Sequence, residues 1–127
     1  MKGIIDYISE NYTKVVEVGL GNYTKIARSL RERGLRVVAT DINAVSEDFD
    51  VIIDNIIEPD LSIYEGSELI YSIRPPMELV PYIENVAKKV RADMLIRPIS
   101  GEYCQGELIN YKGSYFYLKK FRRSRSL

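Results

Sequence analysis

The chain alternates between two patterns of hydrophobic residues. Short apolar runs rich in β-branched residues occur five times, at residues 15–18, 36–40, 49–53, 69–73 and 93–96. Because these runs are continuous and do not alternate with polar residues, we expect strands buried on both faces, as in a parallel sheet covered by helices. Between the runs, apolar residues recur at three- and four-residue intervals, which is typical of helices with one buried face.

Residues at the ends of the helical stretches indicate where each helix begins and ends. The first helix should cover the first 12 residues. The second should lie between Asn22, a suitable N-cap, and Gly34, a suitable stop. Pro75 and Pro76 should open the third, because proline is tolerated in the first turn of a helix.

Two further features complete the order of elements. Residues 58–65 predict a short turn or helix, and residues 107–111 and 115–121 predict a β-hairpin around Lys112-Gly113-Ser114. Alternation of strands and helices predicts an α/β fold of the Rossmann-like, doubly wound type. We expect a mostly parallel sheet of order 3-2-1-4-5 plus the C-terminal hairpin, in three α/β/α layers. A mixed α+β fold is the alternative.

The length of 127 residues predicts one domain, residues 1–121, followed by a basic and flexible tail, residues 122–127. No apolar run approaches the roughly 18 residues that a membrane helix needs. Asp6 interrupts the N-terminal segment where a signal peptide would continue with apolar residues. We therefore expect a cytoplasmic protein with no membrane partner.

The first two strands end in residues suited to binding a nucleoside. Gly19 and Gly21 follow the first strand, where a tight turn brings the backbone close to a ligand at the start of the next helix. Asp41 closes the second strand 20 residues after Gly21, the position from which an acid accepts hydrogen bonds from a ribose diol. The spacing predicts a site for an adenosine-type cofactor near the switch between the first and fourth strands.

The same turn resembles the first motif of class I S-adenosylmethionine-dependent methyltransferases. That motif is an acid, any residue and then Gly-x-Gly, which matches Glu17, Gly19 and Gly21. The resemblance implies that Glu17 lies near the amino group of the methionine moiety and that Asp54, which closes the third strand, meets the adenine. The residues expected to bind the cofactor are Glu17, Gly19, Gly21, Asn22, Asp41 and Asp54.

Two other stretches, residues 71–76 and 95–102, look like those of a small, functionally uncharacterised archaeal family with this Rossmann-like fold. That resemblance supports the predicted fold and implies no activity. The chain departs from both cofactor patterns in the first turn. Thr24 stands where dinucleotide-binding proteins have a third glycine, and Tyr23 stands where many methyltransferases have one. A dinucleotide such as NAD is the alternative ligand.

The tripeptide Ile-Arg-Pro ends both the fourth and the fifth strand, with Arg74 and Arg97 in the middle position. Neighbouring strands lie about 4.8 Å apart, so the two guanidinium groups are placed to bind one carboxylate or phosphate of an anionic substrate. Because arginine has no hydrogen-bond acceptor, Arg74 disfavours an amine as the methyl acceptor. The alternative is that the arginines offset nearby acids, namely Asp41, Asp54 or Glu102.

Acid–base chemistry has few candidates in this sequence. There is no histidine and only one cysteine, Cys104, which excludes a histidine-based triad, a histidine-ligated zinc site and a thiolate metal cluster. We expect no metal. Arg74, Glu102 and Tyr103 are the candidate catalytic residues, because they lie at or just beyond the ends of the fourth and fifth strands. Methyl transfer can proceed largely through positioning, so the lack of a stronger base does not exclude it.

The formal net charge of zero gives no general sign of a nucleic-acid binder. The exception is the C-terminus, where five cations fall within residues 119–125, next to the interleaved aromatics of residues 111–121. Such a combination suits stacking and phosphate contact with RNA. Terminal runs of this kind are more often solvated and disordered. A non-catalytic RNA-associated module is therefore a second alternative.

Overall fold

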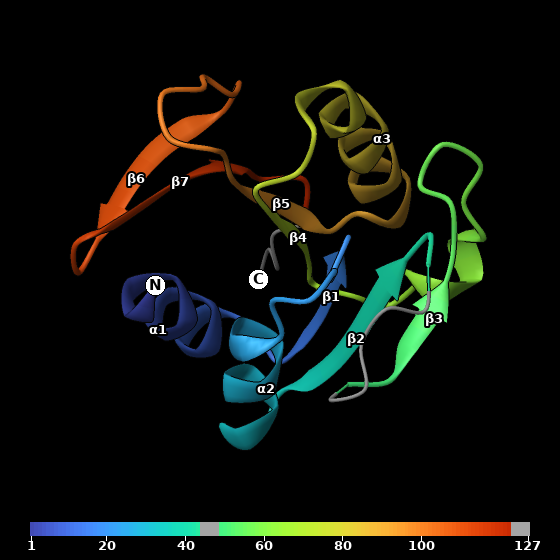
Figure 1. Ribbon diagram of the computed structural model, residues 1–127, viewed down its shortest axis with the longest axis horizontal. Helices are drawn as coiled ribbons and strands as arrows, with labels where there is room; N and C mark the ends of the chain where they lie inside the picture. Colours follow the sequence, from blue (N-terminus) through green and yellow to red (C-terminus); the bar gives the residue numbers. More distant parts are fainter. Residues whose placement is uncertain (44–48, 123–127) are drawn as a thin grey trace, which may run out of the picture.

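The computed structural model describes residues 1–43 and 49–122, which form a seven-stranded sheet of order β3-β2-β1-β4-β5-β7-β6 (Figure 1). The strands are β1 (Lys14–Val18), β2 (Arg36–Asp41), β3 (Val51–Ile53), β4 (Leu69–Ile73), β5 (Asp93–Arg97), β6 (Glu107–Tyr111) and β7 (Ser114–Lys119). Strands β1 to β5 pair in parallel, whereas β7 is antiparallel to β5 and β6. The predicted doubly wound sheet with its C-terminal hairpin is confirmed.

Helices cover both faces of the sheet, as Figure 1 shows. Helices α1 (Lys2–Asn11) and α2 (Lys25–Glu32) lie on one face, and α3 (Val80–Val90) lies on the other. Two 3₁₀ turns, η1 (Leu61–Ile63) and η2 (Met77–Leu79), complete the elements. None of the helices in the described ranges is long and apolar enough to cross a membrane.

The strands at the centre of the sheet are buried on both faces, as their continuous apolar runs predict. Successive side chains point to opposite faces. In β1, Val15 therefore packs with the residues of α1 and α2, whereas Val16 packs with those of α3. Two large cores result, one on each face of the sheet, and a smaller third cluster lies around Phe49.

Helix α2 begins later than the sequence predicts. Its N-cap is Thr24, so Asn22 does not cap the helix and Tyr23 lies outside it. The reason is the turn before the helix. Gly19 and Gly21 both have positive φ angles, 74° and 57°, and the chain needs further residues before it returns to right-handed helical geometry. The predicted stop is confirmed, because Gly34 directly follows the C-cap of α2 with a φ of 94°.

Helix α3 and strand β3 also differ from the predicted boundaries. Pro76 is extended, with ψ of 130°, and the chain forms η2 before α3 begins at Val80. Pro81 thus occupies the first turn of α3 in place of Pro75 and Pro76. Strand β3 has only three residues. Phe49, predicted to lie in that strand, is instead buried against α2 and β2.

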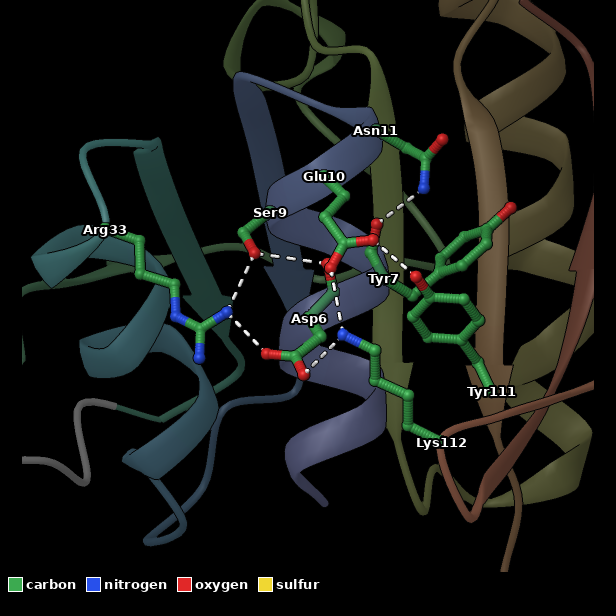
Figure 2. Close-up of polar contacts among 8 residues, drawn as sticks. All are labelled: Asp6, Tyr7, Ser9, Glu10, Asn11, Arg33, Tyr111 and Lys112. Atoms are coloured by element: carbon green, nitrogen blue, oxygen red, sulfur yellow. Dashed lines mark hydrogen bonds and ion pairs between the residues drawn. The ribbon is translucent and has the colours of Figure 1, made fainter.

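Helix α1 is tied to α2 and to the β6–β7 hairpin by a group of polar and charged side chains, which we call the Asp6 cluster: Asp6, Glu10, Arg33, Tyr111 and Lys112 (Figure 2). Asp6 is buried, and its two carboxylate oxygens lie 2.6 Å from Arg33 Nη1 and 3.2 Å from Lys112 Nζ. Hydrogen bonds from these two cations hold the pKa of the Asp6 carboxyl below its usual value. The Tyr111 hydroxyl donates to Glu10, which also pairs with Lys112.

The backbones of α1 and the β6–β7 hairpin also lie close together at this junction. A Cβ atom at Gly3 would lie 2.0 Å from the carbonyl oxygen of Tyr111, so only glycine fits where α1 meets the hairpin. The first helix and the last hairpin of the described chain therefore form one packed unit.

The segment after β7 is anchored at the amino end of β5. The buried Asp93 accepts hydrogen bonds from the Tyr12 hydroxyl at 2.6 Å and from the backbone N–H groups of Phe121 and Arg122, at 3.1 and 3.0 Å. The Arg122 side chain reaches Glu68 at 3.4 Å. Most of the predicted basic tail, residues 123–127, on which the alternative of RNA binding depends, lies outside the described residues. Its anchored start is at the edge of the sheet opposite to the carboxyl ends of the parallel strands.

Candidate functional site

A cavity of about 370 Å³ lies at the carboxyl ends of β1, β2 and β3, and we call it the β1–β3 cavity. Three of the predicted cofactor residues line it: Gly19, Asp41 and Asp54. The other lining residues are mostly apolar, and they come from the ends of the same strands and from the segment that leads into α3. The position agrees with the general rule that doubly wound folds bind ligands beyond the carboxyl ends of their strands.

Asp41 fixes the glycine turn and faces the cavity at the same time. Its Oδ2 accepts a hydrogen bond from the N–H of Gly21 at 2.8 Å, and its Oδ1 accepts one from the N–H of Asn43 at 3.0 Å. A carboxylate offers about four acceptor positions. Two therefore stay available to donors in the cavity, such as the two hydroxyls of a ribose.

Asp54, which also lines the cavity, is held in place by a tyrosine that the sequence analysis missed. The hydroxyl of Tyr64 donates to Asp54 Oδ2 at 2.6 Å, and the N–H of Asp60 donates to Oδ1 at 3.0 Å. Burial of Tyr64 and its hydrogen bond to Asp54 raise the pKa of the Tyr64 hydroxyl, so it stays protonated and acts as a donor. No local pattern points to Tyr64, because η1 brings it under Asp54 through the tertiary fold.

Two isoleucines give the cavity an apolar mouth. Ile42 is 62% exposed and Ile57 is 48% exposed, although both line the cavity. Large apolar side chains left in contact with water at a concave surface are typical of ligand sites. Together with the carboxylates of Asp41 and Asp54, they suit a ligand with a flat apolar ring and several hydrogen-bond donors.

Glu17 is separated from this cavity. It is only 1% exposed, and its Oε1 accepts a hydrogen bond from the hydroxyl of the fully buried Tyr71 at 2.7 Å. Burial raises the pKa of Glu17 to about 8, and the hydrogen bond from Tyr71 offsets only part of that effect. Glu17 is therefore mainly neutral at pH 7 and lies beneath the glycine turn.

The glycine turn is folded over β2. The N–H groups of Gly19 and Leu20 donate to the carbonyl oxygen of Thr40 at 2.9 and 3.2 Å. Nothing lies closer than 3.9 Å to a Cβ built on Gly19, so its positive φ rather than lack of space requires glycine there. Asn22, the next predicted cofactor residue, is exposed in this turn and does not line the β1–β3 cavity.

Arg74 and Arg97 lie side by side in the backbone but rest on different aromatic rings. The N–H of Arg74 donates to the carbonyl oxygen of Arg97 at 2.6 Å. The guanidinium carbon of Arg74 lies 5.5 Å from the ring centre of Tyr23, and that of Arg97 lies 4.0 Å from the ring centre of Tyr115. Within residues 1–43 and 49–122, the ion pairs involve neither arginine.

The remaining catalytic candidates lie nearer to a second cavity, of about 440 Å³, which we call the α3 cavity. Tyr103 and the buried Cys104 line it together with residues of η2 and α3, and burial raises the pKa of the Cys104 thiol. The buried Oε2 of Glu102 has no hydrogen-bond partner among the described residues. Pro76 and Leu79 line the β1–β3 cavity, so η2 separates the two cavities.

Metal chemistry finds no support in the described residues. Across 1–43 and 49–122, no three side chains of His, Cys, Asp or Glu are grouped to hold a metal ion.

Comparison of the whole sequence with known families gives one match that spans almost the entire chain. Residues 1–121 match the model of an uncharacterised protein family, UPF0146. The chain belongs to the UPF0146 family. It is 49% identical to the UPF0146 protein of Archaeoglobus fulgidus over 121 residues, which cover 93% of each chain. It is 36% identical to the UPF0146 protein of Methanocaldococcus jannaschii, over 94% of this chain and 96% of that one. The expected archaeal family is confirmed.

Solved structures similar to the UPF0146 chain include a putative methylase and a sugar N-methyltransferase. A putative methylase from Haemophilus influenzae matches 96% of this chain and 88% of its own length, with a TM-score of 0.58 and 8% identity. The sugar N-methyltransferase KedS8 from Streptoalloteichus matches 84% of this chain with a TM-score of 0.57 and 8% identity, and the UPF0146 chain spans 53% of its length. The UPF0146 chain therefore has a methyltransferase-like fold.

Proposed function

We propose that the UPF0146 chain binds S-adenosylmethionine in the β1–β3 cavity and transfers its methyl group to an anionic substrate. The observation that carries this proposal is the pair of carboxylates, Asp41 and Asp54, on the wall of one cavity at the carboxyl ends of neighbouring strands. Asp41 is the acceptor for the ribose hydroxyls, and Asp54 is the acceptor for the amino group of the adenine. Ile42 and Ile57 cover the ring.

Each carboxylate is held in place before any ligand arrives. The two backbone N–H groups on Asp41 and the Tyr64 hydroxyl on Asp54 fix the side chains, so little conformational entropy is lost on binding. S-adenosylmethionine supplies an electrophilic methyl group on a sulfonium ion. The work left to the protein is to bind and align the two reactants, which suits a chain without histidine.

Two observations favour S-adenosylmethionine over a dinucleotide. The turn reads Glu17, Gly19, Gly21 without the third glycine of dinucleotide folds, and the fold matches methyltransferases. NAD and ATP share the adenosine half, so they are the competing ligands to test.

Isothermal titration calorimetry with S-adenosylmethionine, S-adenosylhomocysteine, NAD and ATP tests the proposal. We expect the first two to bind most tightly. Asp41→Asn and Asp54→Asn should each weaken binding about tenfold or more, because each removes a charged hydrogen-bond acceptor. Asp50→Asn is the matched control, since Asp50 is exposed and does not line the cavity. Tighter binding of NAD, or equal affinity in all three variants, would contradict the proposal.

A further inference from the structure

We propose that Arg74 and Arg97 form the binding site for an oxyanion, a carboxylate or phosphate group of the substrate, at the carboxyl ends of β4 and β5. Calling the bound group a substrate rests on the proposed function. The anion site itself can be measured without any adenosine ligand.

The backbone places the two arginines next to each other at the ends of β4 and β5. Strands β4 and β5 pair in parallel with Ile73 opposite Arg97, and the next residue, Arg74, donates its N–H to the carbonyl of Arg97. Arg74 also lies two residues before Pro76, which lines the β1–β3 cavity. The arginine pair therefore lies at the same edge of the sheet as the β1–β3 cavity.

Both guanidinium groups keep their charge and most of their donors. The faces of Tyr23 and Tyr115 support them without neutralising them, and the ion pairs of the described residues lie elsewhere. A guanidinium has five N–H groups, and Arg97 uses one of them on the carbonyl oxygen of Tyr115 at 2.8 Å. The remaining donors match the two-pronged geometry of a carboxylate or phosphate.

The backbone of Arg74 gives an independent reason to assign it a function. Its φ of 53° is left-handed, a conformation that glycine adopts freely and a side chain with a Cβ adopts at a cost. Strained non-glycine residues concentrate at sites where the side chain must stand in one place. Here the strain lies at the end of β4, beside the point where strand order reverses.

An anionic acceptor also resolves the absence of a general base. A carboxylate oxygen forms a bond to the methyl carbon while the carbon–sulfur bond breaks, and that electron pair stays on sulfur, which becomes a neutral thioether. No proton has to be removed, so two side chains that only donate hydrogen bonds are sufficient. An amine acceptor would instead need a group that accepts its proton, which neither Arg74 nor Arg97 offers.

The test measures binding of two simple anions, inorganic phosphate and malonate, to the full chain by calorimetry. Arg74→Lys and Arg97→Lys keep the positive charge and lose the paired N–H donors of the guanidinium group, so each should weaken binding of the preferred anion about tenfold. The affinity of the double variant should fall by less than the product of the two single-variant factors, because one arginine alone cannot hold the anion from both sides. Arg36→Lys, an exposed site at the amino end of β2, is the control and should bind as the wild type does.

Each outcome decides one point. Preference for phosphate or for malonate assigns the chemical source of the oxyanion. No binding of either probe at about 10 mM, or equal weakening by Arg36→Lys, would overturn the anion site. S-adenosylhomocysteine titrated into the same variants separates the two proposals. If S-adenosylhomocysteine binds and the anions do not, only this inference fails. If the anions bind and S-adenosylhomocysteine does not, the proposed function fails, and the anion site stands without its assignment to a substrate.

Discussion

The neutral Glu17 beneath the glycine turn makes the stability of the protein depend on pH in an unusual direction. Its pKa is about 8 in the folded chain, against an ordinary value of 4.5. Between these two pH values the folded state keeps a proton that the unfolded state has lost. The free energy of unfolding must therefore fall as the pH rises from about 4.5 to about 8, and it should change little through Glu17 outside that range.

The size of the effect follows from the same two values. Each pKa unit of difference between folded and unfolded chains corresponds to about 1.4 kcal/mol. A rise from 4.5 to about 8 therefore gives a loss of about 4–5 kcal/mol on going from acid to alkaline pH. A loss of that size is a large part of the stability of a domain of this length.

Urea denaturation of the wild type and Glu17→Gln, at several pH values from 4.5 to 8.5, measures the effect. Glutamine cannot ionise and keeps an oxygen that accepts the hydrogen bond from Tyr71. We expect similar stabilities near pH 4.5 and a growing advantage of the variant toward pH 8. Glu32→Gln is the control, because Glu32 is exposed on α2. A difference between Glu17→Gln and wild type that stays constant over this range would refute the reasoning.

Three further predictions follow from other contacts. Asp6→Asn should lower the melting temperature at neutral pH, because it removes the carboxylate that pairs with Arg33 and Lys112. The difference in melting temperature between variant and wild type should shrink as the pH falls through the lowered pKa of Asp6, where the wild type also loses its carboxylate; thermal melts followed by circular dichroism measure it. Gly3→Ala should destabilise the fold by roughly 1–3 kcal/mol because its Cβ meets a hairpin carbonyl, while Lys2→Ala on the exposed side should not. If Glu17 meets the amino group of S-adenosylmethionine, binding should release a proton, and the calorimetric enthalpy should change with the ionisation enthalpy of the buffer in wild type but not in Glu17→Gln.

The strands could be predicted because their signals are local, and their order followed from the general rules for doubly wound folds. Continuous apolar runs identify buried parallel strands, and a glycine or charged residue marks each end. The start of α2 could not, because it depends on contacts between distant residues. The N–H groups of Gly19 and Leu20 bond to Thr40 across the sheet, and that arrangement places the first helical residue at Lys25.

The candidate site likewise contains residues that could be predicted from the sequence and residues that could not. Gly19, Asp41 and Asp54 were expected together, because the carboxyl ends of parallel strands meet at one edge, and all three line one cavity. The depth of Glu17 was not predictable, since the motif spacing is the same for a buried acid and an exposed one. Tyr64 was missed for a related reason, because only the folded chain brings it to Asp54.

The Asp6 cluster also sets the order in which the chain can acquire its structure during synthesis. Its contacts join residues 106 positions apart, from Asp6 to Lys112. A helix of ten residues is marginal on its own in water, so α1 depends on tertiary contacts, and those with the hairpin cannot form until the hairpin has left the ribosome. At translation rates of about 5–20 residues per second, the contacts between α1 and the hairpin are delayed by roughly 5–20 seconds. A circular permutant that begins at α2 and carries α1 directly after β7 would place the two partners next to each other in time as well as in space.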